Sequence, residues 1–250
     1  MNETGIETKT RNNGSRQGSD RLAATRYAVF AAPDGAFGEA GAQWLGWDLH
    51  GGRKIDQPDP PGLPRPLAQL TQRPRRYGFH ATIRPPMHLV AGATCAELLS
   101  ALQALCTRAA PIELPPLTLS AAESFIAFRT SRQSAALNAL AATVVKDLDR
   151  LRRPLSQREI TRRNPGALSI PQQLMLARYG TPYVLDEFRF HLTLTDQLAP
   201  EEFPPVGMAA AEHFAGRLSN PWLIEELCLV EEDADGFFQV RGRCRLGQQH

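Results

Sequence analysis

The sequence contains no apolar run that approaches the roughly 18 residues a membrane-spanning helix needs. Its first twenty residues, MNETGIETKTRNNGSRQGSD, lack an apolar h-region, so we expect no secretory signal there. Only four cysteines occur, at positions 95, 106, 228 and 244, and none has Cys-x-x-Cys spacing. This excludes a dense disulfide framework and a cysteine zinc site of the usual spacing. We therefore expect a cytoplasmic protein with no membrane segment.

The chain also lacks a strong excess of charge of either sign. Its 28 Lys and Arg against 26 Asp and Glu give a formal net charge of +2, which does not suggest a general nucleic-acid coat protein. With 42% hydrophobic and 22% charged residues, the 250-residue chain can bury a substantial core. Residues 1–24 are polar and rich in Gly, Ser and Asn, which predicts a disordered tail. Residues 25–250 are expected to form a single bilobed domain.

Hydrophobic periodicity predicts a series of elements that occurs twice. A strand at 77–84 precedes a helix at 94–109 and strands at 112–119 and 124–129. A strand at 187–195 precedes a helix at 207–217 and strands at 223–230 and 237–246. Further helices are predicted at 37–49 and 133–151. Each half needs its neighbour to bury a sheet face, so the pattern predicts an α+β domain with mainly antiparallel sheets.

Two segments far apart in the chain share the pattern Phe-His-x-Thr followed by an aliphatic residue. They are Phe79-His80-Ala81-Thr82-Ile83 and Phe190-His191-Leu192-Thr193-Leu194. From the amounts of His, Phe and Thr present, random placement would give two copies in about one chain in ten thousand. A single His-x-Thr would carry no weight, but the doubled segment in matching strands predicts a shared function.

Side chains in a strand alternate between its two faces. His80 and Thr82 are therefore predicted to share a face with Arg84, and His191 and Thr193 to share a face with Arg189 and Thr195. The phenylalanines and aliphatic residues of both segments would pack into the core. If the two strands face one cleft, two imidazoles, several hydroxyls and two guanidinium groups converge there, with Thr195 expected to be structural.

This set of side chains suits the cleavage of a phosphodiester. A neutral imidazole can take a proton from the attacking water while a protonated one gives a proton to the leaving oxygen, so His80 and His191 are the expected acid and base, in either order. Thr82 and Thr193, together with Arg84 and Arg189, would bind the phosphate oxygens. We expect no metal and no cofactor, because two histidines with hydroxyls make a poor metal-ligand set.

At these segments the chain resembles the 2H phosphoesterase superfamily, which includes 2′-5′ RNA ligase-like proteins and cyclic phosphodiesterases. The phrases RYAVFAAP, RRYGFHATIRPPM and YGTPYVLDEFRFHLTLTDQL resemble one bacterial branch of it that is associated with phosphonate metabolism. The resemblance implies a pseudo-twofold fold with two mainly antiparallel sheets flanked by helices around a central cleft. It also implies that His80 and His191 are the catalytic pair. A small phosphoribosyl 1,2-cyclic phosphate is the substrate that it suggests.

Two alternatives stay open from the sequence. The chain could process RNA ends that carry a 2′,3′-cyclic phosphate or a 2′-5′ linkage, or it could be a module that binds a cyclic nucleotide or phosphorylated sugar without turnover. Tyr77 and Tyr183 could stack on a substrate at the rim of the cleft, although packing is the simpler role for each. A small phosphodiester is the expected partner, RNA a less favoured one, and no obligate protein partner is indicated.

Overall fold

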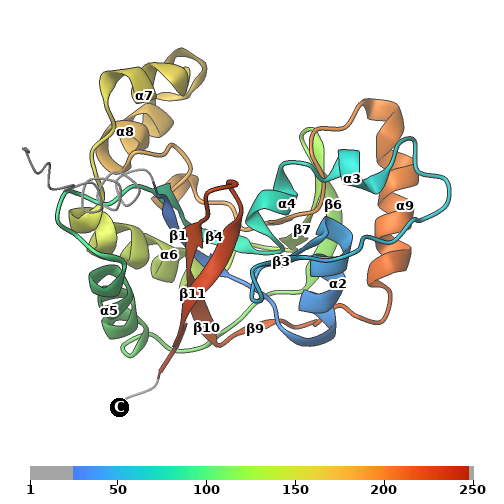
Figure 1. Ribbon diagram of the computed structural model, residues 1–250, viewed down its shortest axis with the longest axis horizontal. Helices are drawn as coiled ribbons and strands as arrows, with labels where there is room; N and C mark the ends of the chain where they lie inside the picture. The colour runs from blue at the N-terminus through green and yellow to red at the C-terminus, as the bar shows by residue number, and fades with distance from the viewer. Residues whose placement is uncertain (1–24, 248–250) are drawn as a thin grey trace, which may run out of the picture.

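A computed structural model describes residues 25–247 of the chain (Figure 1). The predicted tail at 1–24 lies outside the described residues. The main sheet contains β1 (Tyr27–Ala31), β4 (Ala81–Met87), β6 (Leu117–Ala122), β7 (Phe125–Thr130), β8 (Leu192–Thr193), β10 (Glu226–Glu232) and β11 (Phe238–Arg245). Its order is β11-β10-β1-β4-β8-β7-β6, and each pair of neighbours is antiparallel. The predicted α+β class with antiparallel pairing is thus confirmed.

Two short ladders and a set of helices complete the described chain. The ladders pair β2 (Trp47–Asp48) with β3 (Arg53–Lys54), and β5 (Ile112–Glu113) with β9 (Leu223–Ile224). The helices are α2 (Gly35–Leu45), α3 (Leu67–Leu70), α4 (Pro74–Tyr77), α5 (Cys95–Cys106), α6 (Ala135–Leu148), α7 (Gln157–Arg162), α8 (Ile170–Tyr179) and α9 (Phe203–Phe214). Short 3₁₀ turns include η1 (Asp149–Leu151) and η3 (Leu185–Glu187). Among residues 25–247, no helix has both the length and the hydrophobicity needed to cross a membrane.

The predicted internal repeat is present, and its two copies exchange hairpins across the sheet. The first copy runs β4-α5-β5-β6-β7 and the second runs β8-α9-β9-β10-β11. Equivalent strands pair with each other, β4 with β8 and β5 with β9. The β6–β7 hairpin of the first copy lies beside β8 of the second, while β10–β11 of the second lies on the β1–β4 side. Each side of the sheet therefore contains strands from both copies.

This exchange also joins the two predicted sheets into one. The β4–β8 connection has a single residue pair, Ala81 with Leu192, and these two residues hold the same position in the two copies of the repeat. The pseudo-twofold axis therefore passes through that pair. The two lobes remain recognisable, but their strands form one continuous ladder because the equivalent strands meet edge to edge at the axis.

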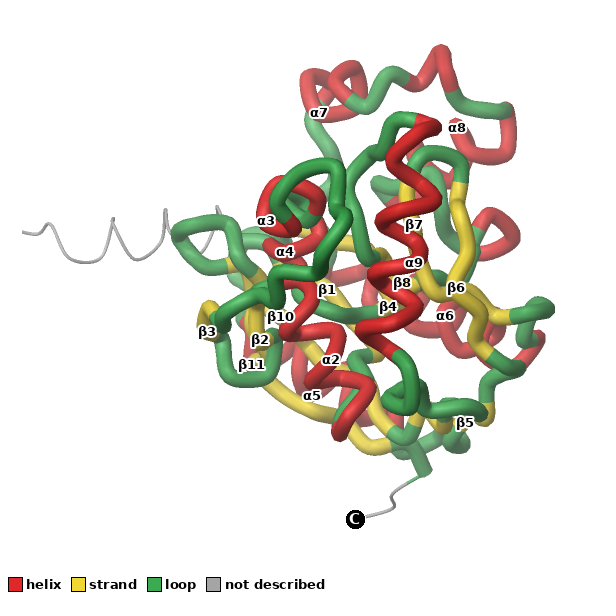
Figure 2. Tube along the Cα trace, turned by 90° about the vertical axis from the view of Figure 1, so that its right-hand side faces the viewer, coloured by secondary structure: helices red, strands yellow, loops and turns green. Residues whose placement is uncertain are grey.

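Helices cover one face of this sheet. α2 packs against α9, which lies over β6 and β7, while α5 and α6 pack together over β10, β11 and β4 (Figures 1 and 2). These amphipathic helices are defined by capping residues where the chain enters them, as where the Thr94 and Glu97 side chains form a capping box at α5. This helical layer covers the hydrophobic core that contains Val29, Ile83 and Leu192.

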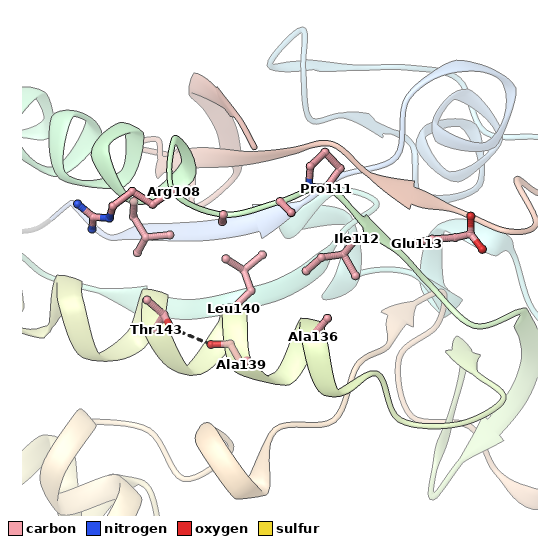
Figure 3. Close-up of a pocket in the computed structure, with 11 residues that line it drawn as sticks. Arg108, Pro111, Ile112, Glu113, Ala136, Ala139, Leu140 and Thr143 are labelled. Carbon is pink, nitrogen blue, oxygen red and sulfur yellow. Dashed lines mark hydrogen bonds between the residues drawn. The ribbon is translucent and has the colours of Figure 1, made fainter. Parts of the chain in front are cut away.

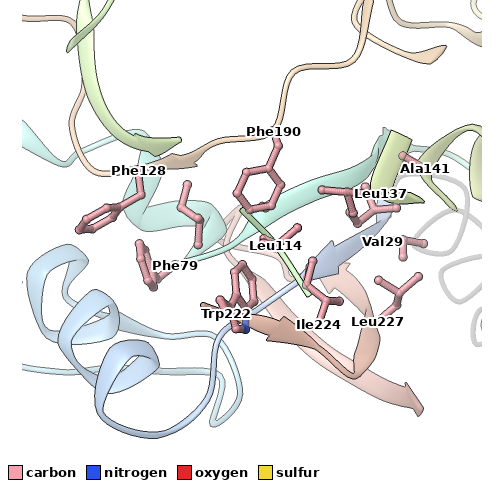
Figure 4. Close-up of a cluster of buried hydrophobic side chains, with 14 of the residues drawn as sticks. Val29, Phe79, Leu114, Phe128, Leu137, Ala141, Phe190, Trp222, Ile224 and Leu227 are labelled. Atoms are coloured by element: carbon pink, nitrogen blue, oxygen red, sulfur yellow. The ribbon is translucent and has the colours of Figure 1, made fainter. Parts of the chain in front are cut away.

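Both motif phenylalanines lie in the core beneath the helices (Figure 4). Phe79 is 4% exposed and Phe190 is 8% exposed, and Phe79 contacts Phe37 of α2 edge-on at 5.1 Å between ring centroids. Gly41 makes room for this ring, since a Cβ atom there would lie 1.9 Å from Phe79. The predicted inward face of each motif is therefore confirmed.

The limits of β4 differ from those of the strand predicted at 77–84. β4 begins at Ala81, because Tyr77 ends α4 and Gly78, at a φ of 71°, turns the chain toward the sheet. β4 then continues through Pro85 and Pro86 to Met87, where prolines were expected to end it. The register between β1 and β4 shifts in this region, and such an irregularity tolerates residues that donate no ladder hydrogen bond.

We expect the Leu192→Ala substitution to lower the free energy of unfolding by about 3 kcal/mol, because it leaves a cavity at the fully buried junction of the lobes. Urea denaturation followed by circular dichroism measures this change. Leu174→Ala on α8, where the side chain is 60% exposed, is the matched control and should change stability little. Equal stabilities for the two variants would contradict the proposed importance of the junction.

Candidate active site

The register of β4 and β8 places both motifs on one face of the sheet. Because Ala81 pairs with Leu192 in an antiparallel ladder, His80 lies across from Thr193 and Thr82 lies across from His191. Ala81 and Leu192 face the core, so these four side chains face the opposite side, where each is partly exposed. The two histidines are diagonal neighbours, a relation with a backbone separation of about 7 Å.

The His80 ring is held in one tautomer and one orientation. Its Nδ1 lies 2.9 Å from the Gly78 carbonyl oxygen, and since a carbonyl can only accept, Nδ1 carries the proton. Nε2 then has a free electron pair, to which the Thr82 hydroxyl donates at 3.0 Å. The ring also stacks on Phe30 of β1, with 3.6 Å between ring centroids.

The pKa of His80 is lowered to about 4, chiefly because burial disfavours the imidazolium. The hydrogen bond to Gly78 opposes this shift, and the charge of His191 adds to it. In the free protein His80 is therefore neutral at pH 7.

His191 is held in the same way. Its Nδ1 donates to the carbonyl oxygen of Arg189 at 2.8 Å, so each catalytic candidate binds the carbonyl of the residue two positions before it. Among residues 25–247, no protein group hydrogen-bonds its Nε2, and Phe125 lies beside the ring at 5.8 Å between centroids. Burial lowers the pKa of His191 and the charge of Arg129 lowers it further.

Arg129 is a site residue that the sequence did not single out. Phe128 pairs with Leu192 and Ala127 with Thr193, so the antiparallel register places Arg129 across from His191. The guanidinium is partly exposed on the same face as both motifs. Its position depends on β7 pairing with β8, and no local signal in the sequence at 124–130 indicates that pairing.

The prediction that Arg84 shares a face with His80 and Thr82 is wrong. Phe30 pairs with Thr82 and Val29 with Arg84, so Ile83 is an extra residue in β4 and forms a β-bulge. The bulge reverses which face of the sheet the following side chains of β4 occupy. Arg84 therefore lies opposite Val29, a core residue. The Arg84 side chain is 1% exposed, with its Nη2 3.6 Å from Asp149.

The other predicted residues have distinct surroundings. The Arg189 guanidinium donates to the Asp186 and Phe188 carbonyls, so a contact with phosphate stays a prediction. Thr195 is buried and accepts from the Ile126 amide at 3.0 Å, in keeping with the structural role expected for it. Tyr77 stacks on Phe238 at 5.0 Å and lies 6.1 Å from the His80 ring. Tyr183 is 58% exposed, and its role at the rim stays a prediction.

Two cavities of about 420 Å³ lie elsewhere in the described chain. One lies between the end of α5, β5 and α6, with Leu140 and Ile112 on its apolar wall and Arg108 and Glu113 near its ends (Figure 3). The other is rich in arginine and lies at the far end of β4. Neither includes a motif histidine among its lining residues. Within residues 25–247, no three His, Cys, Asp or Glu side chains gather as metal ligands would.

Comparison with known proteins identifies a family and two curated relatives. The profile of a family described as "Protein of unknown function (DUF1045)" matches residues 82–239. A protein named ribose 1,5-bisphosphate phosphokinase PhnN from Janthinobacterium sp. (strain Marseille) is 33% identical over 219 residues, 85% of this chain and 48% of that protein. The protein of the same name from Laribacter hongkongensis (strain HLHK9) is 35% identical over 226 residues, 88% of this chain and 51% of that protein. The chain spans about half the length of these relatives.

Solved structures show a weaker likeness. "Crystal structure of E.coli LigT complexed with 3'-AMP" matches with a TM-score of 0.45 and 15% identity, over 90% of this chain and 98% of that one. "Crystal structure of phosphoesterase" matches with a TM-score of 0.41 and 16% identity, over 90% of this chain and 99% of that one. At these TM-scores and identities, neither the function nor the site residues of those structures apply to this chain.

We expect the free energy of unfolding to fall as the pH is lowered from about 6.5, the ordinary pKa of histidine, to about 4, the pKa of His80. Over this range the unfolded chain takes up a proton that the folded His80 does not. His80→Asn removes this contribution, so urea unfolding at several pH values should give a shallower slope for the variant. His191, His88 and His213, whose pKa values are also lowered, remain in both proteins. Identical slopes would contradict a depressed pKa at His80.

Proposed function

The chain belongs to the DUF1045 family of proteins of unknown function, and we propose that it is a metal-independent phosphoesterase that cleaves a cyclic phosphodiester with His80 and His191. The observation that carries this proposal is the register of Ala81 with Leu192, which brings two histidines and two threonines from distant segments onto one face. Their matched Nδ1 hydrogen bonds support the proposal, because both rings are thereby oriented to use Nε2.

His80 acts as the general base in this proposal. Its neutral Nε2 takes a proton from water as the water oxygen attacks phosphorus, and the bond between phosphorus and the leaving oxygen breaks. Protonated His191 gives its Nε2 proton to that leaving oxygen, so the product is a phosphate monoester with a free hydroxyl. Mutual repulsion of the rings favours one proton on the pair, which is the state that this division of roles needs.

Binding of the substrate phosphate favours the protonated form of His191. An anion between the rings raises the pKa of both imidazoles, opposing the burial that lowers them in the free protein. The diagonal placement of the two histidines on one face suits rings that bind opposite oxygens of one tetrahedral phosphate. Thr193 donates a hydrogen bond to a non-bridging oxygen, where negative charge increases in the transition state, and Thr82 does so when its hydroxyl turns away from Nε2 of His80. Arg129 is placed to stabilise the same charge.

A phosphorylated ribose is the favoured substrate class. The curated relatives are named for a ribose bisphosphate, which supports the phosphoribosyl 1,2-cyclic phosphate of phosphonate breakdown that the sequence resemblance implies. The kinase activity in that name is not proposed for this chain. Its three lysines, Lys9, Lys54 and Lys146, include none in a Gly-x-x-x-x-Gly-Lys-Ser/Thr segment.

A panel of phosphodiesters tests the substrate class. It should contain ribose 1,2-cyclic phosphates, nucleoside 2′,3′-cyclic and 3′,5′-cyclic phosphates, and a 2′-5′-linked dinucleotide, each followed by phosphorus NMR. Turnover of the ribose compounds in preference to the others is the expected result. Preference for the dinucleotide or the 2′,3′-cyclic compounds would favour RNA-end processing, and tight binding without any turnover would favour a binding module.

We expect His80→Asn and His191→Asn each to lower kcat by about 10²- to 10⁴-fold, the usual contribution of a general acid or base. His213→Gln on α9 is the matched control, because His213 donates to the Ala40 carbonyl on the helical side and should be dispensable for turnover. Circular dichroism checks that all three variants fold. Turnover like that of the unmodified protein in either motif variant would overturn the assignment.

Turnover should also persist in a chelator, and its rate should rise and then fall with pH as two imidazole groups titrate. A rate that is abolished by chelation and restored by a divalent metal would contradict the proposed mechanism even if the two histidines proved essential.

Thr193, the last residue of β8, and Thr195, two residues beyond it, give a matched pair of Thr→Val variants. Thr193→Val should lower kcat by about tenfold or more with little effect on stability, because its hydroxyl faces the site. Thr195→Val should instead lower the free energy of unfolding by about 1–3 kcal/mol, because the buried Ile126 amide loses its acceptor. Kinetics and urea unfolding of both variants measure the contrast. The reverse pattern would contradict the placement of the Thr193 hydroxyl in the active site.

A further inference from the structure

The second cavity of about 420 Å³ contains far more positive than negative side chains. It is bounded by the start of β1, the end of β4, the segment after η1, α7, and the turn after α8. Its lining includes six arginines: Arg26, Arg84, Arg152, Arg153, Arg162 and Arg163. Glu159 is the one acidic residue among its lining. We call this feature the arginine cavity.

Three carboxylates neutralise only part of this charge. Arg26 pairs with Glu232, and Arg153 donates to Glu159 at 2.8 Å. Arg152 donates to Asp149 at 2.7 Å. Among residues 25–247, Arg162 and Arg163 have no ion-pair partner. Burial lowers the pKa of Arg163, the charge of Glu159 opposes this shift, and the charge of Arg26 adds to it.

Arg84 is the strongest indication of a missing ligand. Its guanidinium is almost fully buried, Nε donates to the Met87 sulfur at 2.9 Å, and Nη1 donates to the Val145 carbonyl at 3.2 Å. Nη2 has no hydrogen-bond partner among the described residues. Asp149 Oδ1 forms an ion pair with it at 3.6 Å, beyond hydrogen-bond distance, and also accepts from Arg152. A buried charged donor left without a hydrogen bond is costly, and a bound anion would supply the missing acceptor.

The backbone on the opposite wall is shaped to leave this space open. Gly180 has a φ of +74°, and a Cβ atom on it would lie 3.1 Å from Nη1 of Arg152. A larger residue there would therefore push the guanidinium away or narrow the cavity. Arg152 is itself held in place by bonds to the Arg153 and Arg178 carbonyls. These contacts give the arginine cavity a rigid wall before any ligand is present.

From this geometry we propose that the arginine cavity is a binding site for a phosphate group. Guanidinium groups bind tetrahedral oxyanions through paired hydrogen bonds, and several arginines around one space favour a doubly charged anion. The site is separate from the histidine pair: neither histidine lines it, and Arg84, which does, lies four residues from His80, about 13 Å at the usual strand rise, with its side chain on the other face of the sheet. It needs no particular reaction at the histidines.

Isothermal titration of the whole protein with inorganic phosphate and pyrophosphate at low salt tests the site. We expect saturable binding that Arg163→Gln and Arg84→Met each weaken by about tenfold or more. Arg158→Gln, an exposed residue of α7 that does not line the cavity, is the matched control and should bind as the unmodified protein does. Circular dichroism shows whether Arg84→Met still folds, and Arg163→Gln, at an exposed position, remains informative if it does not.

His80→Asn separates this site from the proposed active site. Phosphate binding that survives in His80→Asn but is lost in Arg163→Gln supports the arginine cavity. Binding lost in His80→Asn and unchanged in Arg163→Gln would overturn it, as would an absence of saturable binding. Neither result bears on whether the histidines are catalytic, so failure here is distinguishable from failure of the phosphoesterase proposal.

The phosphate could be part of a substrate or a separate molecule, and kinetics distinguish these sources. If it belongs to the substrate, Arg163→Gln should raise KM for a cyclic phosphodiester that carries a second phosphate but not for the same compound without it. If it is a separate anion, the two KM values should respond alike, and inorganic phosphate should act without competing with substrate. Both outcomes support a phosphate site and assign its source.

Discussion

The contact between β4 and β8 determines the rest of this structure. A single pair, Ala81 with Leu192, connects the two sides of the sheet, and it lies where the two copies of the repeat are related to each other. Because equivalent residues face each other there, the histidine of each copy lies across from the threonine of the other. The active arrangement is thus a direct result of pairing a strand with its own repeat. The apolar partners of these residues on the opposite face, under α2 and α9, hold the junction in place.

Much of this arrangement is predictable from the sequence. The doubled Phe-His-x-Thr segment has alternating apolar and polar residues, and strand geometry alone places His80 with Thr82 and His191 with Thr193. The burial of Phe79 and Phe190 agrees with that alternation. The helices predicted at 94–109 and 133–151 correspond to α5 and α6, each of which has an apolar face and a capping residue where it begins.

The sequence could not show features that depend on strand pairing. Alternation assigned Arg84 to the histidine face, but one extra residue in β4 relative to β1 moved it to the core side. Arg129 joins His191 only because β7 of the first copy pairs with β8 of the second. The exchange of hairpins likewise has no local signature, since the apolar pattern of a strand is the same whichever neighbour it takes. Periodicity therefore predicted which side chains share a strand face, but not which strands lie beside each other.

The exchanged hairpins have a consequence for how the protein folds. The strands beside β8 come from one copy of the repeat and those beyond β4 come largely from the other, so neither copy can complete a lobe by itself. Many contacts join residues that are far apart along the chain, and such long loops must close before the contacts form. A nascent chain that has emerged only through β7 would present unpaired strand edges while it waits for its second half. The two histidines would come together once β8 pairs with β4 and β7, which precede it in the chain, while β10 and β11 still have to join beside β1.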